Sequence, residues 1–339
     1  MMNNLSKTVS LGIVFLMTAV MTAGLEAGEI SKTFKNIDLI RIKTVSGDCI
    51  VRKGQADKVK VELSFTFDTD DYEPEIEQAG KRLILSERFH GRSNRGRSTW
   101  RLAVPDNIRI DFSTSSGDFE ASDITAELEA ETASGDISLS HINGQIKGST
   151  ASGDVEVTHL QGNLDFGTAS GDVELSDANG EIEIGTASGG IRAENLRGEL
   201  DLGTASGRIV IEDATGEFDV GTASGRINAR GIEVTAHSEF SAASGDVEVR
   251  LSKSPEHDLT LSSASGDAVL NFDSNPIKGR ITMTAKVDRG RIRAPFKFDG
   301  EETFYKWDDE YVRKTVTMSG NRPRIKISTA SGVAELIEN

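Results

Sequence analysis

A strictly periodic phrase constrains the fold of this chain more than any other feature. The serine of a Ser-Gly pair recurs at six successive intervals of 18 residues, at positions 116, 134, 152, 170, 188, 206 and 224. Looser copies follow at Ser244, Ser265 and Ser331, and an early copy stands at Ser46. A fixed period of this length is typical of stacked structural units that contact only their neighbours. The chain is therefore expected to be a repeat protein.

Each repeat also carries the alternation of a β-strand. Apolar residues stand two and four places after each glycine, as in Val155 and Val157, with polar residues between them. Such strands bury one face, and two of them cannot close a core without neighbouring repeats. We predict an all-β fold, a parallel β-solenoid with 18-residue coils of two strands each, right-handed by the usual crossover preference. Corner glycines are expected at positive φ, and the alanine of each "TAS" phrase is expected to pack inside.

Two other solenoids share this periodicity and fit less well. Left-handed hexapeptide helices also use 18 residues a coil, but they need an aliphatic residue every six, whereas the inward positions here step by two, three and four. Calcium-binding nonapeptide repeats need an aspartate in each unit. The position after the repeat glycine changes from Asp172 to Gly190, Arg208 and Arg226, and arginine would repel calcium.

Four segments are expected along the chain. Residues 1–24 have a single Lys7 and then an apolar run from Val9 to Met21, which is too short to span a bilayer and is typical of a secretory signal peptide. Residues 25–110 are expected to form irregular capping coils, 111–275 the regular solenoid and 276–339 a C-terminal cap. We therefore expect an exported protein, periplasmic, secreted or at the cell surface, with no transmembrane segment after cleavage. Cys49, the only cysteine, excludes an internal disulfide and is expected to be a buried thiol.

Charge is concentrated on one predicted face. The net charge of −16 argues against nucleic-acid binding, because affinity for nucleic acid depends on neutralising phosphates. Outward positions in three successive coils are all carboxylates: Glu181, Glu183, Glu199, Asp201, Glu217 and Asp219. Like charges at strand spacing repel one another, so this acidic face is either well solvated or a site for cations or a basic partner.

Two further segments are candidate binding surfaces. Five arginines, Arg88, Arg92, Arg95, Arg97 and Arg101, predict a flexible basic loop that could hold an anionic envelope polymer or lipid head groups, or have no partner. The stretch "FYKWDDEY" is expected to place Tyr305, Trp307 and Tyr311 on one side of a strand. Such an aromatic patch either holds sugars or cationic groups or caps the open end of the core.

No cofactor and no metal site is predicted. His141 and His159 lie one coil apart and Asp177 continues their column, but three stacked positions spread over roughly 10 Å, too far to share one ion. They are expected to be solvent-facing turn residues. The repeated serines are expected to serve at corners, because a nucleophile needs a base placed beside it.

Four stretches resemble a known family. "KTVSGDCIVRKG" at 43–54, "WRLAVPDNIRIDFSTSSGDFEA" at 100–121, the "TASGD" phrases and the closing "IKISTASGV" are similar to the bacterial β-strand-repeat putative adhesin family, a domain of unknown function. The resemblance covers nearly all of the chain after residue 24 and implies a secreted or envelope-located β-helical domain. It supplies no catalytic residues.

Three functions remain open. The first is a non-enzymatic, exported, adhesin-like module that binds or scaffolds envelope polymers or surface proteins. The second is a polysaccharide lyase or hydrolase, for which Asp172, Glu174, Arg192 and Arg208 are the nearest approach to a catalytic set. The third is a periplasmic sensor or regulatory partner. Ligand and oligomeric state are not determined by the sequence.

Overall fold

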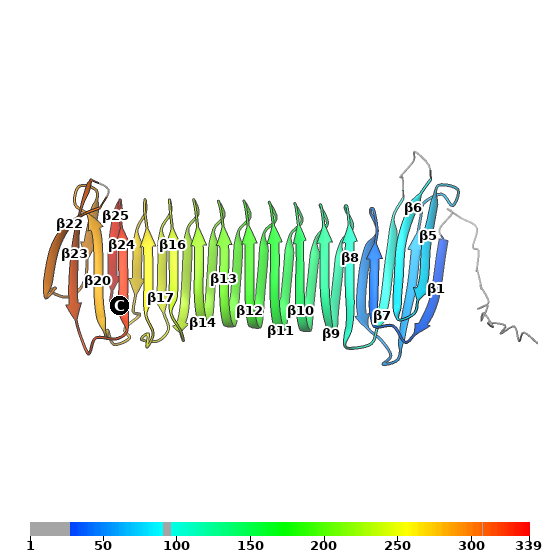
Figure 1. Ribbon diagram of the computed structural model, residues 1–339, viewed down its shortest axis with the longest axis horizontal. Helices are drawn as coiled ribbons and strands as arrows, with labels where there is room; N and C mark the ends of the chain where they lie inside the picture. Colours follow the sequence, from blue (N-terminus) through cyan, green and yellow to red (C-terminus); the bar gives the residue numbers. More distant parts are fainter. Residues whose placement is uncertain (1–27, 91–95, 307) are drawn as a thin grey trace, which may run out of the picture.

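The computed structural model describes residues 28–90, 96–306 and 308–339, and in these residues every regular element is a β-strand. The strands stack into one long rod (Figure 1). The predicted signal peptide, residues 1–24, lies outside the described residues. Within them, no helix is long and apolar enough to cross a membrane.

The centre of the rod consists of six coils in strict parallel register. Each coil contains one 14-residue strand: β9 (Phe119–Thr132), β10 (Ile137–Thr150), β11 (Val155–Thr168), β12 (Val173–Thr186), β13 (Ile191–Thr204) and β14 (Ile209–Thr222). Paired residues of neighbouring coils are 18 positions apart, as Val155 and Val173 are. The β-solenoid and its 18-residue coil are therefore confirmed.

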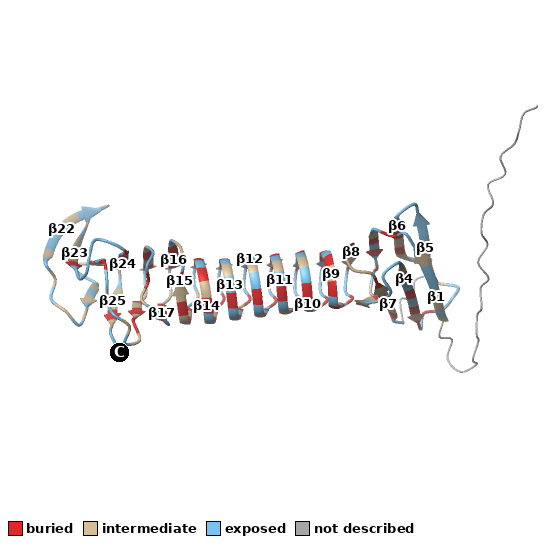
Figure 2. Cartoon of the chain, turned by 90° about the horizontal axis from the view of Figure 1, so that it is seen from below, coloured by how far each residue is buried: buried red, intermediate tan, exposed pale blue. Residues whose placement is uncertain are grey.

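The two predicted strands of a coil are two arms of this one bent strand. In β11, Val155, Val157 and Leu160 point inward from the first part, and Leu164 and Phe166 from the second. The bends between the arms fall at His159, with φ of 55°, and at Gly162, with φ of 141°. The side chains of both arms meet in a core that runs the length of the rod (Figure 2).

The "TASGD" phrase makes the tight corner between coils, in a way that differs from the prediction. Thr168 is buried and its Oγ1 accepts a 3.0 Å hydrogen bond from the Gly171 N–H, while Ala169 points out to solvent. The expectation that alanine packs inside was wrong, because the buried threonine must satisfy the corner amide. Gly171 is not at positive φ. It is required because a Cβ there would lie 1.8 Å from the carbonyl oxygen of Gly153 in the preceding coil.

The N-terminal end is less regular. Its strands are β1 (Gly28–Lys35), β2 (Leu39–Lys43), β3 (Asp48–Lys53), β4 (Lys58–Phe65), β5 (Tyr72–Ala79), β6 (Arg82–Phe89), β7 (Ser98–Val104) and β8 (Ile108–Thr114). β2 and β3 join the stack beside β8 and β9, while β4 runs antiparallel to β1 and β7. Cys49 is fully buried, as expected, and burial raises the pKa of its thiol.

The C-terminal end also combines parallel strands of the stack with antiparallel strands. Its strands are β15 (Ile227–Val234), β16 (Ser238–Ala242), β17 (Val247–Leu251), β18 (Leu259–Ser263), β19 (Ala268–Asn271), β20 (Arg280–Lys286), β21 (Gly290–Arg293), β22 (Gly300–Lys306), β23 (Asp309–Thr317), β24 (Arg324–Thr329) and β25 (Gly332–Ile337). The chain passes from β19 to β20 and β21, forms the antiparallel hairpin β22–β23, and returns. β24 and β25 then fill the layer between β18–β19 and β20–β21.

Candidate functional site: the charged front face

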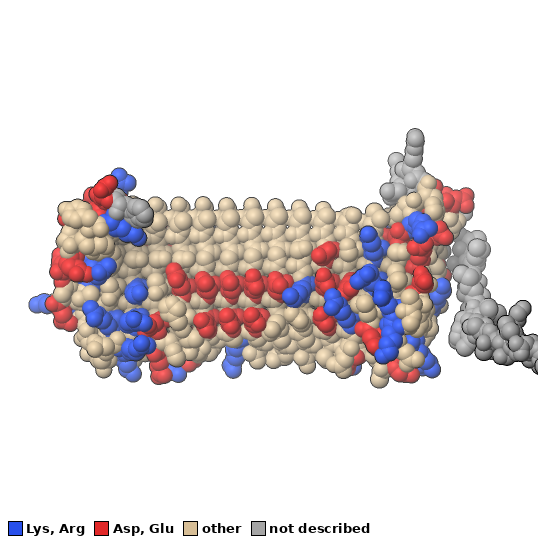
Figure 3. Space-filling view, viewed as in Figure 1, with Lys and Arg blue, Asp and Glu red and all other residues tan. Residues whose placement is uncertain are grey.

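The second arms of the coils form a flat surface, here called the front face, which is the surface seen in Figure 3. In β12 its outward residues are Glu181, Glu183 and Gly185. Because successive coils are in register, equivalent residues form columns along the rod, spaced by about 4.8 Å. The front face is therefore a lattice whose composition changes along the rod.

All six predicted carboxylates of the acidic face lie in two of these columns. Glu181, Glu199 and Glu217 form the first, and Glu183, Asp201 and Asp219 form the second, visible as two red rows in Figure 3. Asp165 and Glu239 extend the second column by one residue at each end. The spacing rule missed Glu239 because this coil is 20 residues long, with Asp219 paired to Glu239.

These columns are acidic and almost without counterions. Asp165 lies 3.6 Å from Lys147, but the other seven carboxylates form no ion pair with any residue that the structure describes. Partial burial, together with the neighbouring charge of Asp219, raises the pKa of Asp201. The like charges therefore add to one another at the middle of the front face.

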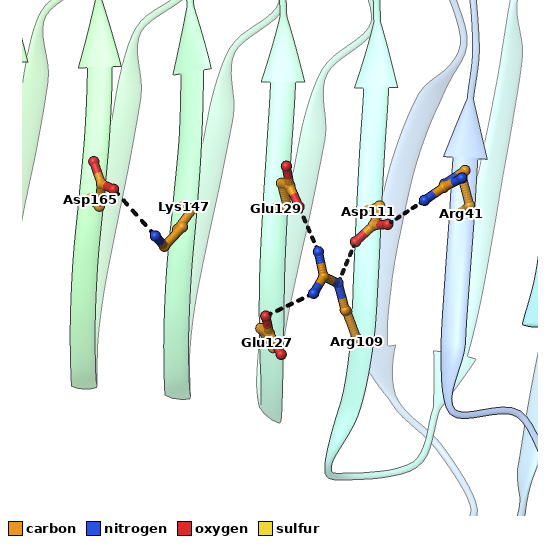
Figure 4. Close-up of polar contacts among 7 residues, drawn as sticks. All are labelled: Arg41, Arg109, Asp111, Glu127, Glu129, Lys147 and Asp165. Atoms are coloured by element: carbon orange, nitrogen blue, oxygen red, sulfur yellow. Dashed lines mark hydrogen bonds and ion pairs between the residues drawn. The ribbon is translucent and has the colours of Figure 1, made fainter.

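Towards the N-terminal end the same columns are neutralised. Arg109 donates to Asp111 at 2.9 Å, to Glu127 at 3.1 Å and to Glu129 at 2.8 Å (Figure 4). Arg41 binds the second oxygen of Asp111 at 3.2 Å. The Arg109–Asp111 pair lies within β8, whereas the other three pairs join neighbouring strands of the stack, so this part of the face is held largely by cross-strand ion pairs and presents little net charge.

The five arginines of the predicted basic loop are not all in a loop. Arg88 lies on β6, 2.5 Å from Glu75, and Arg101 lies on β7 and donates to Ser64 at 3.2 Å. Arg97 directly precedes β7. Arg92 and Arg95 lie outside the described residues. Arg88 and Arg101 are therefore strand residues with partners, which differs from the prediction.

The predicted aromatic patch is also divided. Tyr311 on β23 pairs with Phe304 on β22, and their rings stack at 5.7 Å. Tyr305 follows Phe304 and so points to the opposite side of the hairpin, where it is 73% exposed. Trp307 lies outside the described residues. The expectation that Tyr305 and Tyr311 share one side was wrong, because the chain reverses between them.

The column that contains both histidines makes a corner of the coil. Asp123, His141, His159, Asp177, Asn195 and Asp213 all have φ between 53° and 57°. Asn, Asp and His are the non-glycine residues most often found in this left-handed region. The rings of His141 and His159 stack with centroids 4.4 Å apart. In the described part of the chain, no group of three or more His, Cys, Asp or Glu is placed to hold a metal ion.

Asp172, which belongs to the set considered for catalysis, forms hydrogen bonds to the backbone of neighbouring coils. Asp154 Oδ1 accepts a hydrogen bond from the Asp172 N–H at 2.9 Å, and Asp172 Oδ1 accepts one from the Gly190 N–H at 2.7 Å. These corner aspartates thus link each coil to the next. Glu174 pairs in register with Arg192, which is bound to Glu212 at 3.0 Å.

The stacked coils and the flat charged face define the class of this protein, a β-solenoid with an extended, solvent-exposed lattice of side chains. Residues 106–196 and 144–294 match the family model of Toastrack DUF4097. The chain therefore belongs to the Toastrack family. A search of curated proteins finds no match.

Three solved structures share partial similarity with this chain. A putative cell adhesion protein from Clostridium sporogenes is 11% identical, with 92% of this chain and 99% of that chain covered and a TM-score of 0.21. A putative adhesin from Parabacteroides merdae is 13% identical, with 74% and 89% covered and a TM-score of 0.30. A putative adhesin from Parabacteroides distasonis is 13% identical, with 92% and 98% covered and a TM-score of 0.27.

Proposed function

We propose that this protein is an exported, non-enzymatic, adhesin-like module of the bacterial cell envelope that binds an extended partner along its front face. The observation that carries the proposal is the unbroken register of β9 to β14, which repeats the same outward positions from coil to coil without an inserted loop. A lattice of this kind offers many equivalent weak contacts to a polymer or to a long protein surface, and such contacts gain affinity together.

The acidic columns set the preferred charge of the partner. Seven carboxylates that have no counterion among the described residues favour positively charged groups, and their attraction is strongest at low ionic strength. Envelope localisation is supported by the signal peptide predicted at residues 1–24. The absence of an inserted loop in the regular coils favours binding over a polysaccharide lyase or hydrolase, since such an enzyme needs a cleft that encloses its substrate.

The test is the binding of the purified protein to a panel of peptidoglycan, lipopolysaccharide, envelope glycans and cationic polymers of graded length, at low and high salt. We expect affinity that rises with polymer length and falls with salt. A variant with all six carboxylates of the acidic face changed to their amides should lose most of this binding. Turnover of any glycan in the panel, or binding that does not depend on partner length, would contradict the proposal.

A further inference from the structure

The C-terminal cap contains a groove that the front-face lattice does not explain. The hairpin β22–β23 continues the sheet beyond β20 and rises above the level of the regular coils (Figure 2). Between this hairpin and the outward residues of β16, β18, β24 and β20 lies a groove of about 1130 Å³. Its floor belongs to the stack and its wall to the hairpin, so the two sides differ in chemistry.

The floor is lined by serine and threonine side chains. Thr260 and Ser262 of β18, Ser328 of β24, and Thr282 and Thr284 of β20 all line it. They are neighbours in register: Ser262 pairs with Ser328, and Ser328 with Thr284. None of the five hydroxyls makes a hydrogen bond to another residue within the described ranges. A hydroxyl both donates and accepts, so this floor suits a ligand that carries many hydroxyl groups of its own.

The wall supplies an aromatic surface. Phe304 and Tyr311 stack across the hairpin with centroids 5.7 Å apart, and the Arg313 guanidinium lies 4.4 Å from the centre of the Phe304 ring. Both rings line the groove, whereas Tyr305 does not. Aromatic faces pack well against the apolar faces of sugar rings, whose hydroxyl groups would then point to the floor.

The groove is positively charged in a chain whose net charge is −16. Arg280, Lys306, Arg313, Arg324 and Lys326 line it, with Glu302 as the only carboxylate in its lining. Glu302 is already bound to Arg313 at 2.6 Å, and Arg324 to Asp258 at 2.6 Å. Arg280 and Lys326 are exposed and form no ion pair within the described part of the chain. Arg280 and Lys326 are thus available at the hydroxyl-lined floor, and Lys306, which is also exposed and forms no ion pair among the described residues, is available at the wall.

We infer that this groove binds an anionic glycan, a polysaccharide segment that carries uronate or similar carboxylate groups. Hydroxyls of the floor would meet sugar hydroxyls, the Phe304–Tyr311 pair would stack on a ring, and Arg280 and Lys326 would pair with the carboxylates. The inference rests on the proposed binding role and adds a ligand class that the acidic columns would repel. It therefore assigns opposite charge preferences to two parts of one face.

The experiment is calorimetric titration of the purified protein with three hexamers: hexagalacturonate, neutral maltohexaose and hexaglutamate. We expect hexagalacturonate to bind in a salt-dependent way and the other two to bind at least tenfold more weakly. Lys326→Gln and Arg280→Gln should each weaken hexagalacturonate about tenfold, the effect of one charge-assisted hydrogen bond. Lys43→Gln removes an exposed lysine at the far end of the rod and should leave affinity unchanged.

Each other result overturns the inference in a recognisable way. Equal binding of hexaglutamate would make an acidic protein segment the ligand, and equal binding of maltohexaose would remove the role of charge. Unchanged affinity in both Lys326→Gln and Arg280→Gln would place the site elsewhere. A protein that still binds cationic polymers through the acidic columns, but not hexagalacturonate, would refute the groove and leave the proposed function intact.

Discussion

Replacing a corner glycine should weaken the stack by an amount that follows from its geometry. In Gly171→Ala the new Cβ would lie 1.8 Å from the Gly153 carbonyl oxygen, whereas ordinary contact begins at 3.4 Å. The two coils must therefore separate by more than 1 Å at this corner. The separation stretches the bond from the Ser170 N–H to the Ala151 oxygen, 3.1 Å, and the bond from the Asp172 N–H to Asp154, 2.9 Å.

The cost can be estimated from these contacts. Two lost hydrogen bonds at about 1 kcal/mol each, added to roughly 1–2 kcal/mol for overpacking, predict a loss of about 3–4 kcal/mol in the free energy of unfolding. Gly185→Ala is the matched control, because nothing lies within 4 Å of its added Cβ and its φ is not positive. It should be neutral or stabilising by up to about 1 kcal/mol, since alanine restricts the unfolded chain.

Urea unfolding followed by far-ultraviolet circular dichroism measures both variants, with the slope of the transition checked for a change in cooperativity. A Gly171→Ala midpoint equal to that of Gly185→Ala would refute the claim that close approach of the coils selects glycine here. A loss in both variants would instead indicate a general need for small residues on this part of the coil.

Three further predictions concern other parts of the rod. His159→Val should lower the free energy of unfolding by about 1–2 kcal/mol, whereas His159→Asn should be nearly neutral, because a β-branched residue is disfavoured at φ of 55°. Urea unfolding measures both variants, and equal midpoints would contradict this. The raised pKa of Asp201 means that folding favours its protonated form, so its charge lowers stability as the pH rises above the pKa of the unfolded chain. Asp201→Asn should therefore raise the free energy of unfolding at pH 7 by less than about 1 kcal/mol and leave it unchanged at pH 3. A gain that persists at pH 3 would contradict the electrostatic cause. Cys49 should resist iodoacetamide at pH 8 in the folded protein and react in urea, and rapid modification without urea would show that the N-terminal cap opens.

The regular coils were predictable because one physical rule generates them. Alternation placed Val155 and Val157 inside, and the 18-residue period placed Glu181 beside Glu199. Both follow from the pleat of a strand and from register, which are local properties repeated many times. The acidic columns, the surface most relevant to the proposed function, could thus be located from the sequence.

The predictions failed where the chain departs from an extended strand. The direction of Ala169 depends on the hydrogen bond from the Gly171 N–H to Thr168, which alternation does not describe. Tyr305 and Tyr311 lie on opposite sides of the hairpin because the chain reverses between them, and the two-residue alternation of a strand does not predict such a reversal. The groove of the C-terminal cap depends on pairing between β18 and β24, whose residues are 66 positions apart, and no local pattern reports such a contact.

The placement of β24 and β25 inside the stack determines the order in which the rod can be completed. Thr260 of β18 pairs with Lys326, and Arg41 of β2 pairs with Asp111, so in each case the partner strand comes much later in the chain. Until those later residues have been synthesised or exported, the edges of β18 and β2 that face them are open. Open edges invite pairing with other chains. The C-terminal layers therefore cannot all close until β24 and β25 have been made, because these last strands of the chain lie between layers formed by earlier residues.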